Sequence, residues 1–310
     1  MILCVTLNAA IDKTYVIEGF KPGEIFRVKE TKALPGGKGI NVSRVIHSLG
    51  GDVLAAGFIG GHNGAFIEER LAAEGIPSAF VRVKPESRVT ISIIDPICSS
   101  ETGLYEHGPV IDREDWERFK DHFARQLNKA DMIMLSGSLP AGLPSSAYAE
   151  LIRMAKARQR SVILDTSGEA LRVGLAAHPW MVKPNRVEAE ELLGCPLDSQ
   201  SSVVEGIKRL LADGLEAVAV SLGKDGVIGG CADGIWSVRP PQVKAISSVG
   251  AGDSFVAGFA LSWLRQGDFA EALRYATACA AAGVTKVGAG VLSPADVQHL
   301  AKVVQVEKIG

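Results

Sequence analysis

The sequence alternates short apolar runs rich in β-branched residues with longer segments that repeat apolar residues at helical spacing. This alternation is typical of a mainly parallel sheet covered on both faces, because parallel strands need helical crossovers. It predicts strands over Ile2–Leu7, Val53–Phe58, Met132–Leu135, Val162–Leu164 and Ala217–Val220. It predicts helices over Gly39–Leu49, Ala65–Glu74, Arg113–Lys129, Ser146–Arg158, Val203–Asp213 and Ala251–Arg265.

Two stretches break the alternation, because they contain strand-like runs with no helix between them. One joins residues 14–16 to 27–32, and the other joins residues 88–95 to 103–106. We expect these runs, within insertions at about 13–33 and 87–108, to form a small sheet that acts as a lid or a subunit contact. No repeat or linker divides the rest, so we expect one domain over residues 1–310.

Charge and cysteine content exclude several classes of protein. The 33 Lys and Arg against 35 Asp and Glu give a formal net charge of -2, which favours neither nucleic acid nor an anionic membrane as a partner. The five cysteines are odd in number and never form a C-x-x-C pair, which argues against disulfides and zinc and predicts a cytoplasmic protein. The apolar start at Ile2–Leu7 lacks a basic region, so it predicts a strand and not a signal peptide. No apolar run approaches the roughly 20 residues that span a bilayer.

Polar or small residues follow four of the expected strands and the short apolar pair Met181–Val182. Ligands bind beyond the carboxyl ends of strands in open α/β sheets, so these positions predict a binding site at one edge of the sheet. The residues are Asn8 and Asp12, Ser136–Ser138, Asp165, Lys183–Asn185 and Ser221–Gly223.

The segment Val249–Ala257 places two glycines at the start of a predicted helix and a carboxylate in its first turn. Gly250 and Gly252 let backbone N–H groups approach an anion, and the helix adds about half a positive charge there. Asp253 could take a proton from an attacking hydroxyl while the N–H groups stabilise the charge on a transferred phosphate. The alternative is an ordinary helix start with an Asp that favours the dipole.

The glycine loop Pro35–Asn41 suits close approach by a sugar, with Lys38 as a cation and Asn41 as an amide partner. It does not match the Walker phosphate loop, and a tight turn is the alternative. Asp12 could bind sugar hydroxyls or cap a turn. Arg88 could bind a phosphate through its planar fork or remain a solvated surface charge.

Two further motifs have both a functional and a structural interpretation. The spacing from Asn185 to Glu188 fits a capping box, while Glu188 could also act through water on a nucleotide's Mg²⁺. The segment Ser221–Gly226 fits a hairpin turn or a loop that lines a nucleotide. The six histidines show no metal-ligand spacing, and none is assigned a catalytic role.

The order of these motifs along the chain resembles that of the ribokinase-like sugar kinases. Within them it is similar to the phosphofructokinase B group, which includes 1-phosphofructokinases and tagatose-6-phosphate kinases. The matching motifs are N-A-A-I-D at 8–12, G-G-K-G-I-N at 36–41, S-G-S-L-P at 136–140, K-P-N-x-x-E at 183–188, S-L-G-x-x-G at 221–226 and G-A-G-D-S at 250–254. The resemblance implies a three-layer α/β sandwich with a β lid, ATP and Mg²⁺ as cofactors, and a homodimer that meets through its lids.

The resemblance also implies roles for individual residues. It makes Asp253 the base and Gly250, Ala251 and Gly252 the anion hole. It assigns Lys183, Asn185, Ser221, Gly223 and Gly226 to the nucleotide, and Glu188 to Mg²⁺ through water. It assigns Asp12, Gly37, Lys38, Asn41, Arg88 and Ser138 to the sugar phosphate, and Arg27 to a phosphate in the neighbouring subunit.

Three departures from the family pattern lie on the sugar side. Ala9 stands where proline is usual, Ser87–Thr90 lacks an Asn near Arg88, and Gly103 stands where Glu is common. These departures leave the identity of the sugar phosphate open. A monovalent-cation requirement near Ser247 and Val249 also stays open.

The sequence therefore predicts a kinase that transfers phosphate in line from MgATP to a ketohexose monophosphate, namely tagatose 6-phosphate or fructose 1- or 6-phosphate. A kinase of a free sugar or nucleoside is the first alternative, and Lys38 and Arg88 argue against it because they favour an anionic substrate. An inactive sugar-phosphate sensor is the second, and Asp253 argues against it. A dehydrogenase is disfavoured because Gly250–Gly252 continues to Phe255, where the dinucleotide fingerprint has a small residue.

Overall fold

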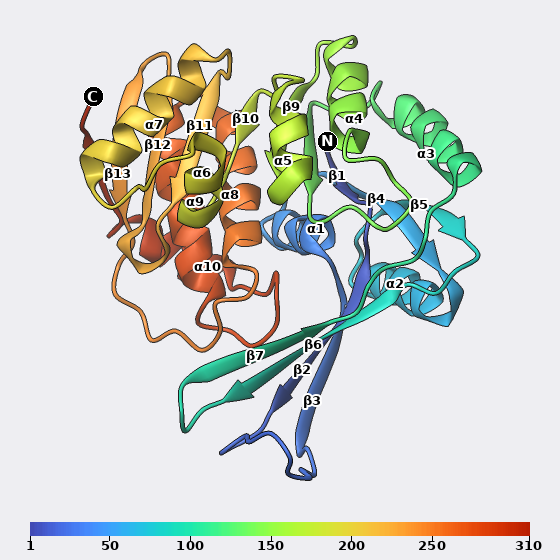
Figure 1. Cartoon of the computed structure of the whole chain (residues 1–310). Coiled ribbons are helices and arrows are strands. Elements are labelled where there is room, and N and C mark those ends of the chain that lie inside the picture. Colours follow the sequence, from blue (N-terminus) through green and yellow to red (C-terminus); the bar gives the residue numbers. More distant parts are fainter.

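Ten strands form the central sheet, in the order β14-β13-β12-β11-β10-β9-β8-β1-β4-β5 (Figure 1). The computed structural model describes residues 1–310. All neighbours from β5 to β11 pair in parallel, and β12 to β14 complete the sheet with antiparallel pairs. The strands are β1 (Ile2–Thr6), β4 (Val53–Gly60), β5 (Ser78–Val83), β8 (Met132–Ser136), β9 (Ser161–Asp165), β10 (Met181–Val182), β11 (Ala217–Ser221), β12 (Val227–Cys231), β13 (Gly234–Arg239) and β14 (Gln305–Lys308).

Helices cover both faces of this sheet. This arrangement confirms the predicted three-layer α/β sandwich. One face carries α1 (Lys38–Ser48), α2 (Gly61–Ala73), α8 (Ala251–Gln266), α9 (Phe269–Gly283) and α10 (Pro294–Ala301). The other carries α3 (Arg113–Gln126), α4 (Ala147–Lys156), α5 (Gly168–Leu175), α6 (Arg186–Leu193) and α7 (Gln200–Ala212). None of these helices is both long and apolar enough to cross a membrane.

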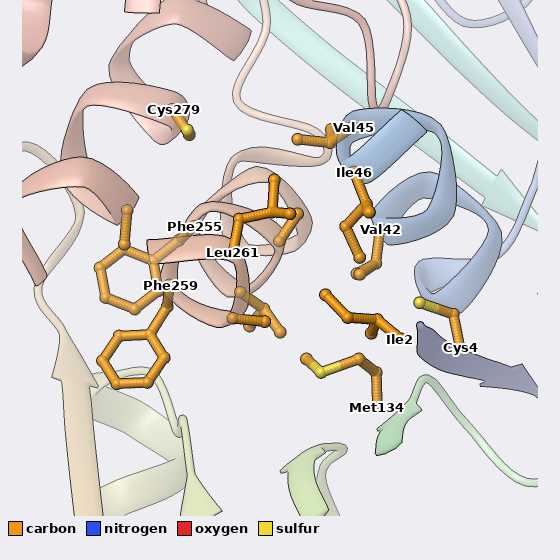
Figure 2. Packing of buried hydrophobic residues seen from close by; sticks show 14 of the residues in the cluster. Ile2, Cys4, Val42, Val45, Ile46, Met134, Phe255, Phe259, Leu261 and Cys279 are labelled. Atoms are coloured by element: carbon orange, nitrogen blue, oxygen red, sulfur yellow. The ribbon is translucent and has the colours of Figure 1, made fainter. Parts of the chain in front are cut away.

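The core consists of two apolar clusters, one on each face of the sheet. Alternate residues of β1 point into different clusters, because successive strand side chains face opposite ways: Ile2 and Cys4 lie in the first, Leu3 and Val5 in the second. In the first cluster, Val45 and other α1 side chains lie near α8 (Figure 2). This packing fixes the two helix N-termini, at residues 38 and 251, relative to the sheet.

A second sheet of four strands projects from the body in the order β3-β2-β6-β7 (Figure 1). We call it the lid, and its strands are β2 (Ala10–Val16), β3 (Glu30–Gly36), β6 (Arg88–Asp95) and β7 (Ser100–Tyr105). The two insertions pair through β2 and β6, which are parallel. The lid strands β2 and β6 begin directly after the carboxyl-end loops of the main sheet, so the lid stands over that edge.

The predicted strand over residues 27–32 is present, but its bounds are wrong. Strand β3 begins only at Glu30, because its partner β2 ends at Val16, which pairs with Glu30. It then continues to Gly36, so Pro35 and Gly36 lie in the strand and not in the predicted loop. Pro35 is tolerated because β3 is an edge strand, where a missing N–H leaves no neighbour unpaired.

The other predicted elements are present, with ends shifted by up to four residues. The largest shifts are at α2, which begins at Gly61 and not at Ala65, and at β2, which begins at Ala10 and not at Thr14. The sequence pattern did not assign the helices α5, α9 and α10 or the strands β5, β13 and β14.

Candidate active site

A cavity of about 490 Å³ lies between the lid and the carboxyl ends of the central strands. Residues that follow β1, β8, β10 and β11 line its floor, and Asp12, Thr90 and Glu101 of the lid line its roof. Only 3 of its 28 lining residues are hydrophobic, so the cavity suits a polar, charged ligand. It holds most of the site residues predicted from the sequence: Asp12, Gly37, Lys38, Asn41, Arg88, Ser138, Lys183, Asn185, Glu188, Ser221, Gly250, Gly252 and Asp253.

A second cavity, of about 600 Å³, adjoins the first. Lys183, Ser221 and Gly252 line both cavities, so they mark the junction. The remaining walls are largely small or apolar, and they include the predicted residues Gly223, Gly226 and Ala251. Arg27 lies in neither cavity and is exposed between β2 and β3.

Asp253 lies in the first turn of α8 and is only 5% exposed. The Asn41 side chain donates a hydrogen bond of 2.9 Å from Nδ2 to Oδ2 of Asp253, whereas Oδ1 has no hydrogen-bond partner in the chain. Burial raises the pKa of Asp253 to about 6, although Lys38 acts in the opposite direction. A carboxylate with this pKa and a free oxygen can serve as a general base near neutral pH.

The N-terminus of α8 presents open backbone donors beside that carboxylate. The N–H groups of Gly250, Gly252 and Asp253 have no acceptor in the chain, whereas the N–H of Ala251 donates to the carbonyl of Ser248 at 3.3 Å. Gly250 has φ of 81°, and a Cβ there would lie 2.9 Å from Cα of Ala289. Helix α8 thus begins where the sequence predicted, at Ala251, but the N–H of Ala251, which the resemblance assigned to the anion hole, is already engaged.

Asp165, which the sequence placed at the binding edge of the sheet without a specific role, organises the junction of the two cavities. It is buried at the end of β9, and its Oδ1 accepts from Lys38 Nζ at 3.2 Å and lies 3.3 Å from Lys183 Nζ. Burial alone would raise the pKa of Asp165, but Lys183 and Lys38 hold it below its usual range. Lys38, Lys183 and Asp165 together carry one net positive charge, and their two ammonium groups can donate to an anion. A polar residue directly after a buried strand was the available signal.

The glycine loop brings α1 close to the end of β1. Gly37 has φ of 98° at the N-cap of α1, and a Cβ there would lie 2.7 Å from Cγ2 of Thr6. A residue larger than glycine would push the helix away from the strand. The close contact directs Lys38 and Asn41 into the cavity.

The lid side of the cavity carries groups that could bind a sugar phosphate. Thr90 donates from Oγ1 to Asp12, and burial raises the pKa of Asp12 against the effect of that bond. Arg88 donates from Nε to the carbonyl of Asn8 at 3.3 Å and from Nη1 to the carbonyl of Glu106 at 3.4 Å. These bonds hold the guanidinium at the cavity wall.

Asn8 and Ser138 connect two strand ends at the cavity floor. The Asn8 amide donates to Oγ of Ser138 at 3.1 Å, and both residues line the cavity. Across the cavity, Glu101 of β7 accepts from Oγ of Ser247 at 3.0 and 3.2 Å. The hydroxyl of Ser247 in turn accepts from the N–H of Val249, just before the α8 turn. The lid therefore contacts the loop that precedes the open donors, a contact the sequence did not predict.

Two structural interpretations considered for the motifs are confirmed. Asn185 and Glu188 form a capping box at α6, with bonds of 2.9 Å and 2.8 Å. Strands β11 and β12 form an antiparallel hairpin around the turn at 223–225. Neither finding removes these residues from the site, because Asn185, Glu188 and Ser221 also line the first cavity.

The chain holds no group of three or more His, Cys, Asp and Glu side chains that could bind a metal ion by themselves. A divalent ion at this site would therefore depend on phosphate oxygens and water in addition to one or two carboxylates, which is the usual pattern for Mg²⁺.

Comparison with known proteins gives consistent results across sequence and structure. The family model described as pfkB family carbohydrate kinase matches residues 3–296. A tagatose-6-phosphate kinase from Staphylococcus epidermidis is 35% identical over 281 residues, which are 90% of each chain.

Solved structures agree with this match over the whole chain. A possible 1-phosphofructokinase from Thermotoga maritima superposes with a TM-score of 0.92 at 29% identity, with 100% of both chains covered. Phosphofructokinase-2 from Escherichia coli in complex with substrates and products gives 0.91 at 29% identity, with 97% of this chain and 98% of that chain covered. The Escherichia coli protein has also been solved with potassium and in a tetrameric inhibited form.

Kinases of this kind transfer a phosphoryl group from ATP, with a divalent metal ion, to an alcohol group. The family match over almost the entire chain and the shared fold support one assignment. This protein belongs to the pfkB family of carbohydrate kinases.

Proposed function

We propose that this kinase phosphorylates a ketohexose monophosphate to the bisphosphate, with tagatose 6-phosphate and fructose 1- or 6-phosphate as its candidate substrates. The observation that carries the proposal is one polar cavity that joins the open oxygen of Asp253 to the guanidinium of Arg88. The first group suits a hydroxyl that is to be phosphorylated, and the second suits a phosphate already on the sugar. The similarity to a tagatose-6-phosphate kinase supports this substrate class.

Asp12, Asn41 and Ser138 would bind the sugar hydroxyls, because carboxylate, amide and hydroxyl groups all line the same cavity. Arg88 would bind the existing phosphate. Lys38 was predicted to do the same, but its ammonium pairs with Asp165 near the cavity junction. We therefore place Lys38 with the transferred phosphate, and Arg88 becomes the main determinant of an anionic substrate.

Asp253 would remove the proton from the attacking hydroxyl through Oδ1, while Asn41 holds Oδ2. The open N–H groups of Gly250, Gly252 and Asp253 would stabilise the charge that develops on the transferred phosphoryl group. These groups are already in place before substrate binds, so little reorganisation is needed in the reaction.

The second cavity fits a nucleoside, and the junction fits its phosphates. The small and apolar wall around Phe255 and Val284 suits a base, and Gly223 and Gly226 leave room beside it. Lys183 and Ser221 lead from that wall to the first cavity, so ATP would bind across both. Glu188 would hold Mg²⁺ through water, because only its Oε2 is used by the capping box. The bound ion would neutralise charge on the phosphates.

We also propose that two copies associate through their lids. The lid exposes large apolar side chains that a monomer would leave in water: Ile25 is 97% exposed, and Leu104 and Tyr105 are more than half exposed. Arg27 lies beside Ile25 on the same segment, which is consistent with a contact to a neighbouring subunit. Sedimentation velocity should then give a dimer for the wild type and a monomer for Leu104→Glu.

A coupled assay of ADP release tests the function. With ATP and a panel of acceptors, at least one ketohexose monophosphate should give turnover, whereas free tagatose, fructose and nucleosides should be poor acceptors. Equal use of free and phosphorylated sugars would assign the protein to the free-sugar kinases. Binding of a sugar phosphate without any turnover would support the inactive sensor.

A further inference from the structure

Arg44 is a buried residue of α1 that does not line either cavity and has no assigned role. Arg44 is only 8% exposed, and a charged side chain this deeply buried needs partners for its N–H groups. Its Nε donates to Oε2 of Glu74 at 2.6 Å, and Nη2 donates to Oε1 of Glu74 at 3.4 Å and to the carbonyl of Pro35 at 2.8 Å. Its Nη1 donates to Oδ1 of Asn41 at 3.4 Å and to the carbonyl of Ala289 at 3.3 Å. All five N–H donors of the guanidinium are therefore used.

The bond to Asn41 determines which way the Asn41 amide faces. An amide has one acceptor oxygen and one donor nitrogen, and Arg44 can only donate. With Oδ1 directed at Arg44, Nδ2 is left to donate to Asp253, as observed. The reversed amide would place two donors together at Arg44 and two acceptors together at Asp253. Arg44 therefore disfavours the orientation in which Asp253 loses its only hydrogen bond.

The same guanidinium also joins the end of β3 to a loop that borders the site. Pro35 precedes the turn at Gly37, and Ala289 lies against Gly250 at the start of α8. Through one rigid, planar group, Arg44 thus connects the end of β3, the Asn41 amide and Ala289, the residue that packs against Gly250 at the start of α8. Lysine could not replace it, because an ammonium lacks the fork that reaches several acceptors at once.

We propose that Arg44, held by Glu74, is a positioning residue that orients the Asn41 amide and through it the carboxylate of Asp253. This inference rests on the proposed function, in which Asp253 is the base. Arg44 lines neither cavity, so it should affect turnover more than substrate binding.

The test measures kcat against pH, with the KM for ATP, for Arg44→Met and Arg44→Lys. The Asn41 bond stabilises the ionised form of Asp253, so its loss should move the acid limb of the kcat profile to higher pH. The charges that face Asp253 from the other elements, Lys38, Asp165 and Lys183, stay in place. We expect kcat to fall by about 10- to 100-fold near pH 6 and by less at pH 8, with the KM for ATP little changed.

A double-mutant cycle with Asn41→Ala identifies the route of the effect. If Arg44 acts through Asn41, adding Arg44→Met to Asn41→Ala should cause little further loss of kcat. Additive losses, or an unchanged acid limb in the single variants, would overturn the proposal. Should Arg44→Met fail to fold, Arg44→Lys keeps the charge opposite Glu74 and decides the question alone.

Two controls distinguish the positioning role of Arg44 from a general loss of stability and from a failure of the proposed function. Val45 is the residue after Arg44 in α1, and its side chain lies in the apolar core (Figure 2), so Val45→Ala should leave a cavity there and lower stability without moving the acid limb. Asp253→Asn is measured in parallel. Wild-type turnover in Asp253→Asn would contradict the proposed function itself, whereas a normal profile in the Arg44 variants alone would contradict only the positioning role.

Discussion

Asp253 is a carboxylate that ionises with difficulty, because burial raises its pKa from the ordinary value of 3.8 to about 6. A base works only when it has lost its proton, so activity should rise with pH through this value. We predict that kcat/KM of the wild type falls on the acid side with an apparent pKa near 6 and is level above it. Rates measured from about pH 5 to 9 check this; a flat profile down to pH 5 would contradict it.

The same pKa predicts the sign of an effect on stability. Because the folded-state pKa lies above the unfolded value, ionisation of Asp253 opposes folding. That destabilisation is present above about pH 6 and disappears as the pH falls below 4. Asp253→Asn should therefore have a higher urea midpoint than the wild type at pH 8, and the difference should shrink at pH 4. A midpoint that is lower at pH 8 would show that the carboxylate stabilises the fold.

Arg88 should determine the preference for a phosphorylated sugar. Charge-assisted hydrogen bonds contribute about 1.5–3 kcal/mol, so Arg88→Ala should raise the KM for the sugar phosphate roughly ten- to a hundredfold. The KM for ATP should change little. Arg82→Ala is a matched control, because Arg82 pairs with Glu68 on the surface outside the cavity. Equal effects of the two variants would remove Arg88 from the site.

At the scale of single residues, the sequence motifs contained several residues that line the cavity, but they did not indicate which residues these would pair with. The motifs contained Lys38, Asn41 and Asp253, but the pairs Lys38–Asp165 and Asn41–Asp253 join positions 127 and 212 residues apart. A local pattern cannot predict such pairs, because they depend on the three-dimensional packing of α1 against the sheet and α8. For this reason the motif and the resemblance, which assigned Lys38 to the sugar phosphate, did not reveal its pairing with Asp165.

Among the elements, α8 depends most on its first turn. Gly250 and Gly267 flank the helix with φ of 81° and 68°, but only Gly250 is close to another backbone. Gly267→Ala should cost about 1–2 kcal/mol of stability and leave kcat unchanged, because nothing lies near its Cβ. Gly250→Ala should cost at least as much and also lower kcat at least tenfold, because the turn must move away from Ala289. Urea unfolding and kcat measured on both variants distinguish these effects.

Elements with strong periodicity were predictable, whereas the ends of strands depended on their partners. The buried strands β1, β4 and β8 are short, continuous apolar runs, which is the pattern expected of strands covered on both faces. The start of β3 at Glu30 could not be predicted, because it is determined by where β2 stops. The capping box at α6 shows that one motif can have a structural and a site role together.

For the whole molecule, the fold brings segments from the entire chain to one edge of the sheet. The first cavity is lined by residues from Thr6 to Ala289, and the lid reaches it through Asp12, Thr90 and Glu101. The order of motifs predicted this convergence, because strand ends of a parallel sheet meet at one edge. It did not predict that the lid touches Ser247 beside the α8 turn, since that contact joins residues 146 positions apart.

The central claim is that Asp253 removes the proton from the sugar hydroxyl within this cavity. The most direct test is kcat of Asp253→Asn at pH 8 with saturating ATP and the best sugar phosphate, together with calorimetric binding of both substrates. The account predicts a loss of kcat on the order of 10²- to 10⁴-fold with dissociation constants close to wild type. A kcat within about threefold of the wild type, with normal binding, would contradict it.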